Sequence, residues 1–164
     1  MIFSIGYSNR SLCEFLYEVE RRCITQLWDV RSSPWSRNTH FNASQIERWA
    51  CKAGIMYRRE GEILGGMRDV CLRDPRYLEA LVRLLDASGR EHIAIMCAEG
   101  DPEHCHRTWD IAASLLVRWG VVVKSVRRDG RNEDSTSSLA RVRKRHFDPA
   151  IRDAVSRVLR GDLI

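Results

Sequence analysis

The chain has 164 residues, a length that suits one domain and allows a substantial hydrophobic core. Hydrophobic residues make up 44% of the chain and charged residues 30%, which excludes a disordered protein, and no apolar run approaches the roughly 18 residues that cross a membrane. The net charge is +5, and all but three of the 27 basic residues are arginines, whose planar guanidinium suits phosphate groups and base edges. This balance permits nucleic-acid binding without establishing it.

The six cysteines do not indicate a disulfide framework, because a chain of this length folds without such links. The first residues carry neither the basic segment nor the cleavage site of a signal peptide, so we expect a cytoplasmic protein with reduced thiols and no membrane association. The oligomeric state, monomer or homodimer, stays open.

In chain order, the first expected element is a short strand at 3–5, which ends at Gly6. Ser11 and Glu14 have the spacing of a capping box and predict that a helix begins there. Further strands are expected at 24–30, at 55–57, at 92–97 and from residue 121. Helices are expected to alternate with these strands, with ends or beginnings marked by Gly54, Pro75 and Gly120.

This alternation predicts a single α/β domain of three layers, in which a mostly parallel sheet of about four to five strands is flanked by helices. Residues 1–126 form the expected α/β core. Residues 127–146 are polar and then basic, and we expect a flexible basic loop there. Residues 147–164 are expected to form a C-terminal helix that packs on the same domain.

Open parallel sheets bind ligands beyond the carboxyl ends of their strands, so the residues that follow the expected strands are site candidates. The first strand is followed by Gly6, Tyr7, Ser8 and Arg10, and the second carries Asp29 at its carboxyl end and is followed by Arg31 and Ser32. Strand 92–97 ends at Cys97 and is followed by Glu99, His104, Cys105, His106 and Arg107. We expect these residues to meet at one rim, where the N-terminus of the next helix favours an anion.

Four segments carry a family resemblance. They are SIGYSNR at 4–10, DVRSSP at 29–34, LGG at 64–66, and CAE at 97–99 followed by CHR at 105–107. Together they resemble the domain-of-unknown-function family DUF488, over residues 1 to about 126. The resemblance implies a compact cytosolic α/β protein of a kind found mainly in bacteria and archaea. Tyr7 stands where that family often has a histidine, and the segment after Val123 lacks another histidine that the family would lead us to expect.

The leading functional hypothesis is a hydrolase that cleaves a glycosidic bond in nucleic acid, a nucleotide or a modified base, as DNA glycosylases and nucleoside hydrolases do. Glu99 is the expected general acid or base, and Asp29 its electrostatic partner. Phosphate binding is assigned to Arg10, Arg31 and Arg107, proton relay to His104 and His106, and base stacking to Tyr7 or Trp35. In the competing interpretation, Asp29 and Arg31 form a salt bridge that braces a loop.

Two other classes of function stay open. In the first, Cys97 is the nucleophile of a sulfur or phosphoryl transfer, as in rhodaneses and phosphatases, although Glu99, Asp101 and Glu103 in the following loop disfavour an anion. In the second, a non-catalytic module recognises a nucleotide or nucleic-acid phosphate through arginines.

A metal site is the last alternative. It would draw on Cys97, His104, Cys105 and His106, whose spacing is not a familiar zinc pattern. We therefore expect no metal and no cofactor.

Overall fold

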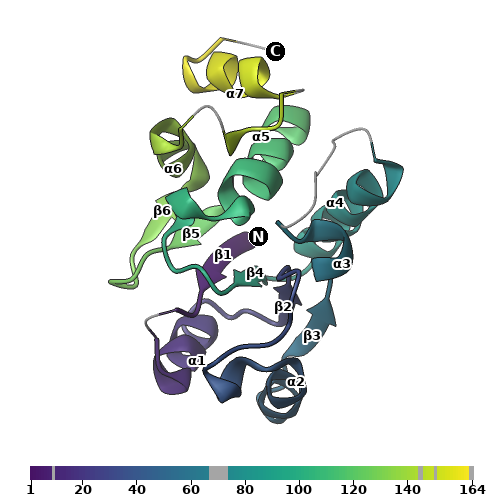
Figure 1. The fold of residues 1–164 in the computed structure, drawn as a ribbon, viewed down its shortest axis with the longest axis vertical. Coiled ribbons are helices and arrows are strands. Elements are labelled where there is room, and N and C mark those ends of the chain that lie inside the picture. Colours follow the sequence, from purple (N-terminus) through teal and green to yellow (C-terminus); the bar gives the residue numbers. More distant parts are fainter. Residues whose placement is uncertain (9, 67–73, 144–145, 150, 163–164) are drawn as a thin grey trace.

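The computed structural model describes residues 1–8, 10–66, 74–143, 146–149 and 151–162. A six-stranded sheet runs through the molecule in the order β3-β2-β4-β1-β5-β6 (Figure 1). Its strands are β1 (Ile2–Gly6), β2 (Gln26–Asp29), β3 (Met56–Arg59), β4 (Ile93–Cys97), β5 (Lys124–Val126) and β6 (Asn132–Asp134). Only the β5–β6 pairing is antiparallel. The predicted α/β class and mostly parallel sheet are confirmed, with one strand more than expected.

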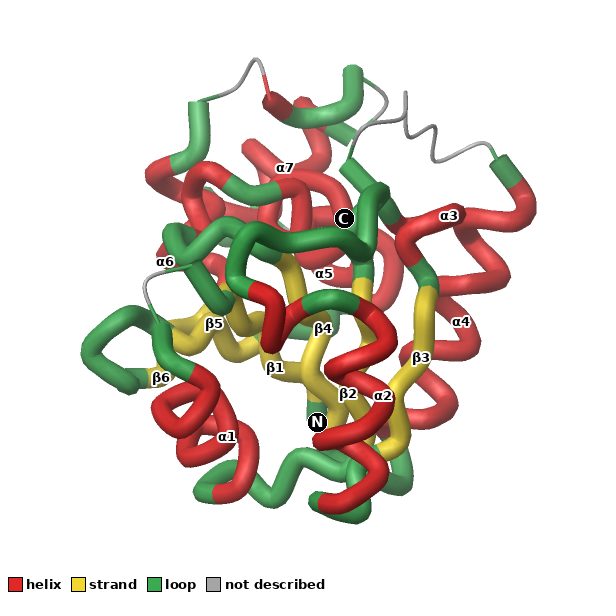
Figure 2. The backbone as a smooth tube through the Cα atoms, turned by 60° about the horizontal axis from the view of Figure 1, so that its bottom comes forward, coloured by secondary structure: helices red, strands yellow, loops and turns green. Residues whose placement is uncertain are grey.

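Helices cover both faces of the sheet, so the domain has the three layers that were predicted (Figure 2). One face carries α1 (Leu12–Glu20) and α2 (Ala43–Lys52). The other carries α3 (Gly61–Leu64), α4 (Pro75–Ser88), α5 (Ala113–Trp119), α6 (Ser135–Arg141) and α7 (Arg152–Leu159). The short turns are η1 (Thr39–Phe41), η2 (Pro102–His104) and the π-helical η3 (Arg107–Ala112), which leads into α5.

Side chains of β1 alternate between the two faces and so contribute to two separate cores. Phe3 and Ile5 pack in the core beneath α1 and α2. Ile2 points the other way, into the larger core that α4 and α5 cover, and Ile93 and Ile95 of the neighbouring β4 join it there. Buried residues on both faces are what a central parallel strand requires.

Local signals place the helix ends. The Ser11 hydroxyl accepts a hydrogen bond from the backbone N–H of Glu14 at 3.2 Å, and the Glu14 carboxylate accepts one from the Ser11 N–H at 2.6 Å, which confirms the capping box. α4 begins at Pro75 as expected. Gly120 ends α5 at φ 65°, a left-handed conformation that a residue without Cβ adopts most easily.

The order of the strands opens a crevice between the carboxyl ends of β1 and β4. The chain leaves β1 through α1 on one face and continues to β2, whereas it leaves β4 through α5 on the opposite face and continues to β5. Because the two strands are neighbours and their connections leave over opposite faces, the edge between them is a topological switch point of the sheet; the edge between β4 and β2 is another by the same criterion. In folds of this class ligands bind at such points.

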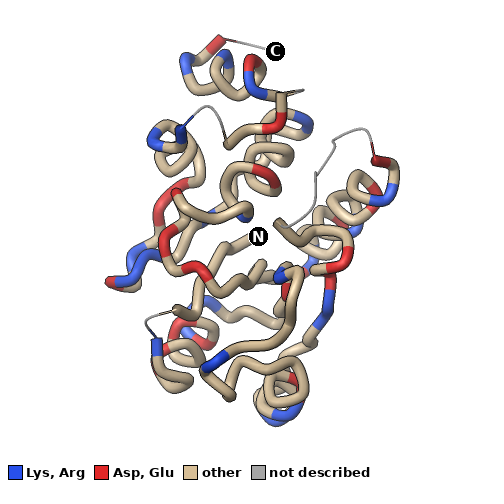
Figure 3. The backbone as a smooth tube through the Cα atoms, viewed as in Figure 1, with Lys and Arg blue, Asp and Glu red and all other residues tan. Residues whose placement is uncertain are grey.

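The segment 127–146, expected to be a flexible basic loop, contains regular structure. Its described residues include β6, which pairs with β5, and all of α6. Figure 3 shows acidic and basic residues interspersed along the β5–β6 connection. Arg127 bonds Asp101 and Glu103, and Arg141 bonds Glu103 and Glu133, so these charges tie the segment to the loop after β4.

Within the described ranges, no helix is long and apolar enough to cross a membrane. Five cysteines are free thiols there, namely Cys13, Cys23, Cys51, Cys97 and Cys105. Cys71 lies outside the described residues.

Candidate functional site

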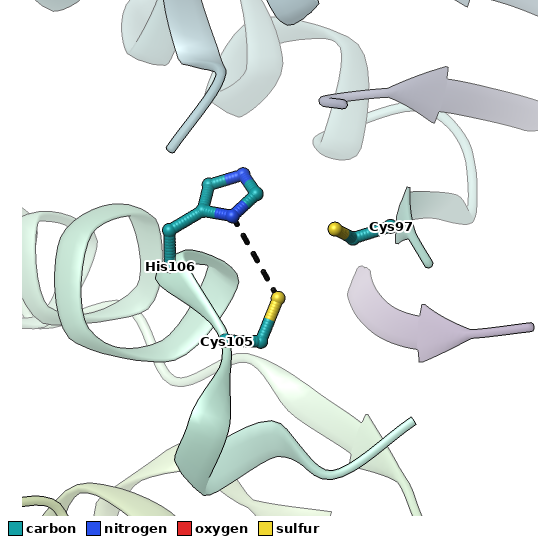
Figure 4. A group of neighbouring side chains, drawn as sticks. All are labelled: Cys97, Cys105 and His106. Atoms are coloured by element: carbon teal, nitrogen blue, oxygen red, sulfur yellow. Dashed lines mark hydrogen bonds between the residues drawn. The ribbon is translucent and has the colours of Figure 1, made fainter. Parts of the chain in front are cut away.

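Two cysteines and a histidine converge beyond the carboxyl end of β4. Cys97 is the last residue of β4, Cys105 follows η2, and His106 precedes η3. Their sulfur and imidazole nitrogen atoms lie within 4.8 Å of one another and point toward a common centre (Figure 4). Cys105 is only 2% exposed and His106 is also buried, whereas Cys97 is partly exposed. We call these three residues the thiol cluster.

The hydrogen bonds of His106 fix its tautomer. Its Nε2 lies 3.0 Å from the carbonyl oxygen of Val30, and since a carbonyl only accepts, Nε2 must carry a proton. Nδ1 therefore has a free lone pair when the ring is neutral, and it lies 3.7 Å from Cys105 Sγ. Gly66 packs on the ring so closely that a Cβ there would lie 2.5 Å from His106 Cγ. The imidazole is thus held as a base directed at the Cys105 thiol.

Arg107 is a fully buried cation beside the same thiol. It is 1% exposed, and its guanidinium donates to Cys105 Sγ at 3.1 Å, to Ser4 Oγ at 3.1 Å and to the Glu99 carbonyl. A buried charge is costly unless it is balanced, and no carboxylate of the described chain forms an ion pair with Arg107. Among its contacts, the Cys105 sulfur is the group that can carry a negative charge, as a thiolate.

Proton affinities in the cluster follow from these contacts. A hydrogen bond from Cys97, followed by the effects of Arg107 and His106, lowers the pKa of Cys105 well below its ordinary value despite burial. The hydrogen bond to Cys105, together with burial, raises the pKa of Cys97. Of the two thiols, Cys105 therefore loses its proton the more readily. In the alternative of sulfur or phosphoryl transfer the sequence indicates Cys97 as the nucleophile; the adjacent Cys-His-Arg residues are the signal for Cys105.

Asp29 and Arg31 form the bracing salt bridge that was the competing interpretation. Arg31 donates to both carboxylate oxygens of Asp29, at 2.8 and 2.5 Å, and Tyr57 donates to the second at 2.6 Å. The remaining Arg31 contacts are Tyr7 Oη and the Phe41 carbonyl. Although burial opposes the charge, the bonds to Asp29 raise the pKa of the Arg31 guanidinium. Both side chains are thus committed inside the protein.

The other predicted site residues are dispersed along the rim. The Glu99 side chain is exposed and accepts from the Asp101 N–H at 2.8 Å. His104 is also exposed and lies 3.3 Å from Asp101, outside the thiol cluster. Tyr7 is buried and stacks on Phe41 with ring centroids 4.2 Å apart, so its ring face is occupied.

Trp35, the second predicted stacking residue, is 67% exposed. Ser32 lines a cavity of about 510 Å³ together with Asp29 and Arg31. Gly6 has no room for a side chain, because a Cβ would lie 1.9 Å from the Glu99 carbonyl oxygen. This close approach fixes the end of β1 against the loop after β4.

A cavity of about 1000 Å³ lies at the carboxyl ends of β1 and β4. Ser8 and Arg10 line it from the loop after β1, Glu99 and Asp101 from the loop after β4, and the β5–β6 connection closes it. The Glu99 backbone joins this cavity to the thiol cluster, because its carbonyl accepts from Arg107.

The thiol cluster also has the composition of a metal site. The 3.7 Å between Cys105 Sγ and His106 Nδ1 is close to the edge of a tetrahedral zinc site, about 3.6 Å from usual bond lengths. Charge balance argues otherwise. Arg107 already neutralises one thiolate, whereas a divalent ion with two thiolates and this guanidinium leaves a net positive charge in the interior. The metal-free pair is the better balanced arrangement.

A sequence profile described as "Domain of unknown function DUF488" matches residues 11–71 and 68–110, which together span more than half of the chain. The chain belongs to the DUF488 family. No curated protein and no solved structure matches it. The DUF488 match ends within η3, so it covers Asp29, Arg31 and the whole thiol cluster but not the β5–β6 connection.

Proposed function

We propose that this chain is a cysteine-dependent sulfurtransferase in which the Cys105 thiolate accepts and passes on a single sulfur atom. The observation that carries the proposal is the pairing of Cys105 with the buried Arg107 guanidinium, because a thiolate rather than a thiol is the nucleophile in such chemistry. The His106 Nδ1 lies 3.7 Å from the same sulfur and accepts a hydrogen bond from Cys105 when Cys105 is a thiol.

Sulfur transfer fits this site better than phosphoryl transfer does. A phosphoryl group in transfer needs several free hydrogen-bond donors around its oxygens. The described contacts of Arg107 instead direct its donors to the Cys105 sulfur, a hydroxyl and a carbonyl. A sulfane sulfur atom needs no such cradle.

The transfer balances in two displacements. The Cys105 thiolate attacks the outer sulfur of a hydropersulfide R–S–SH; a new S–S bond forms on Cys105, the S–S bond of the donor breaks, and R–S⁻ leaves with the electron pair. An acceptor thiolate then attacks the outer sulfur of the Cys105 persulfide, and the Cys105 thiolate leaves. The Cys97 sulfur lies within 4.8 Å of the Cys105 sulfur, beside the reacting atom in both steps.

Persulfide loading tests the proposal directly. The protein is incubated with glutathione hydropersulfide, and peptide mass spectrometry locates any gain of one sulfur atom. We expect loading at Cys105, its transfer to dithiothreitol as hydrogen sulfide, loss of both in Cys105→Ser, and retention of loading in the matched variant Cys51→Ser, since Cys51 is an exposed thiol on α2. Chelator treatment should leave loading unchanged. Loading that survives in Cys105→Ser, or never reaches Cys105, refutes the proposal.

Glycosidic-bond hydrolysis by carboxylates stays a second candidate because Glu99 is exposed and lines the cavity of about 1000 Å³. Asp29 contributes less than expected from the sequence, since both its carboxylate oxygens are bonded to Arg31 or Tyr57. The separating experiment is release of free base from nucleosides, nucleotides and DNA. Glu99→Gln should abolish release if the carboxylate mechanism holds, and no release from any of these substrates refutes it.

A further inference from the structure

We infer that the cavity at the carboxyl ends of β1 and β4 binds the phosphate group of a small organic phosphate between Arg10 and Arg128. The inference does not depend on the reaction at Cys105. Arg10 follows β1 and is 7% exposed, and it lines both the cavity of about 1000 Å³ and an adjoining one of about 490 Å³. Arg128, in the β5–β6 connection, lines the same two cavities and is exposed.

Arg10 forms no ion pair within the described ranges, although Glu14 and Glu18 line the smaller of its two cavities. Four arginines are buried in the described part of the chain. Arg22 and Arg31 bond the carboxylates of Glu18 and Asp29, and Arg107 bonds the sulfur of Cys105. Arg10 donates only to the carbonyls of Gly6 and Arg127, at 2.6 Å each. Its Nε–H and one N–H on each terminal nitrogen have no partner among the described residues. A buried guanidinium in this state gains most from an anion.

Most other charges in the cavity neutralise each other. Arg127 and Arg141 bond the carboxylates of Glu103 and Glu133. Arg131 bonds Asp129 at 2.6 Å. Arg128 forms no ion pair within the described ranges, so Arg10 and Arg128 are the two cations of the cavity that remain to be matched. Two guanidinium groups suit a phosphate, which carries up to two negative charges and accepts several hydrogen bonds.

The rest of the lining favours an organic phosphate over the free ion. Ser8 offers a hydroxyl, and Glu99 offers a carboxylate whose charge disfavours a second anion and favours a hydroxyl or amine donor. The cavity volume lies at the upper end of the usual range for ligand pockets and exceeds what one ion needs. A phosphorylated sugar or a nucleoside monophosphate has this combination of one phosphate and several hydroxyls.

Calorimetric titration at fixed ionic strength tests the site. The probes are AMP, ribose 5-phosphate, adenosine and inorganic phosphate. We expect AMP and ribose 5-phosphate to bind, inorganic phosphate to bind more weakly and to compete with them, and adenosine not to bind. Losing a charge-assisted hydrogen bond costs about 1.5–3 kcal/mol, so Arg128→Gln should weaken binding at least about tenfold.

Matched variants separate a site from general charge attraction. Arg48→Gln removes the same charge from an exposed position on α2 and should leave affinity unchanged. Arg10→Lys keeps a buried cation with fewer donors and should bind AMP more weakly while folding normally. Cys105→Ser should bind AMP as the native chain does, so that failure of the sulfur chemistry leaves this inference standing. Equal losses in Arg128→Gln and Arg48→Gln, or binding of adenosine as tight as that of AMP, overturn it.

Discussion

The Cys105–Arg107 pair makes a quantitative prediction about thiol acidity. Arg107→Met removes the guanidinium while keeping an unbranched side chain in its place. The lost contact is a hydrogen bond from a cation to Cys105 Sγ at 3.1 Å, in an interior where Arg107 is 1% exposed. Hydrogen bonds to charged groups contribute about 1.5–3 kcal/mol, and one pKa unit corresponds to about 1.36 kcal/mol. The pKa of Cys105 should therefore rise by about 1–2 units.

The assay is the ultraviolet absorbance of the thiolate as a function of pH. Subtracting the titration of Cys105→Ser from that of the native chain isolates Cys105 from the other thiols, and the same subtraction is made in the Arg107→Met background. Ser4→Ala is the milder variant: it keeps the guanidinium and removes one of its anchors, the Ser4 hydroxyl at 3.1 Å. Its midpoint should move in the same direction by a smaller amount.

An unchanged midpoint in both variants would refute the reasoning, because it would mean that Arg107 does not stabilise the thiolate. Removing one partner of a buried pair can cost about 3–5 kcal/mol of stability, so the circular dichroism spectrum of each variant must show a folded protein first. Arg76→Met is the matched control, since Arg76 bonds Asp74 at 3.0 Å on the surface and its loss should leave the Cys105 titration unaltered.

Two further predictions concern residues around the thiol cluster. Burial raises the pKa of Asp110 to about 7, with His106 opposing the rise and Asp148 and Cys105 adding to it. The pKa of an aspartate in the unfolded chain is near 3.8, so the folded state holds this proton more tightly, and the free energy of unfolding should fall as pH rises from about 4 to 7, by at most about 4 kcal/mol. In urea titrations Asp110→Asn should remove this pH dependence. A pH slope in the variant like that of the native chain contradicts the assignment. Gly66→Ala places a Cβ 2.5 Å from His106 Cγ and should displace the ring. We expect the free energy of unfolding to fall by about 1–3 kcal/mol in the same titrations and persulfide loading to become slower. Full loading at native stability would show that the ring does not need its present position.

Local signals predicted much of the fold. The capping box at Ser11, the proline that begins α4 and the apolar β4 are all short-range features of the sequence. α6 escaped prediction for a physical reason. Its buried Ser135 and Ser138 fill core positions through hydrogen bonds, to the Val123 N–H at 3.1 Å and to Glu133 at 2.7 Å, and such serines resemble a polar linker in the sequence. β6 consists of three polar residues and lacks the alternation of a strand.

The rim itself was predictable, but the direction of each side chain was not. Parallel strands place Asp29 and Cys97 on the same edge of the sheet, as expected. What decided the role of Asp29 was Tyr57, which reaches it from the neighbouring β3, and this contact depends on strand order. Arg107 begins a π-helical turn, and its guanidinium runs inward to β1, a path that no spacing rule anticipates.

The buried arginines differ in the group that balances their charge. Arg22 and Arg31 are balanced by carboxylates, which ionise well below neutral pH and so bind a cation at little cost. Arg107 instead faces a thiol, whose ordinary pKa is about 8.5. Part of the interaction free energy of the pair is therefore needed to keep that thiol ionised at neutral pH. A carboxylate at position 105 would balance the charge of Arg107 at a lower cost in free energy, so stability alone does not account for a cysteine there. The arrangement makes sense if the product of the pairing, a buried and reactive sulfur, is what the protein uses.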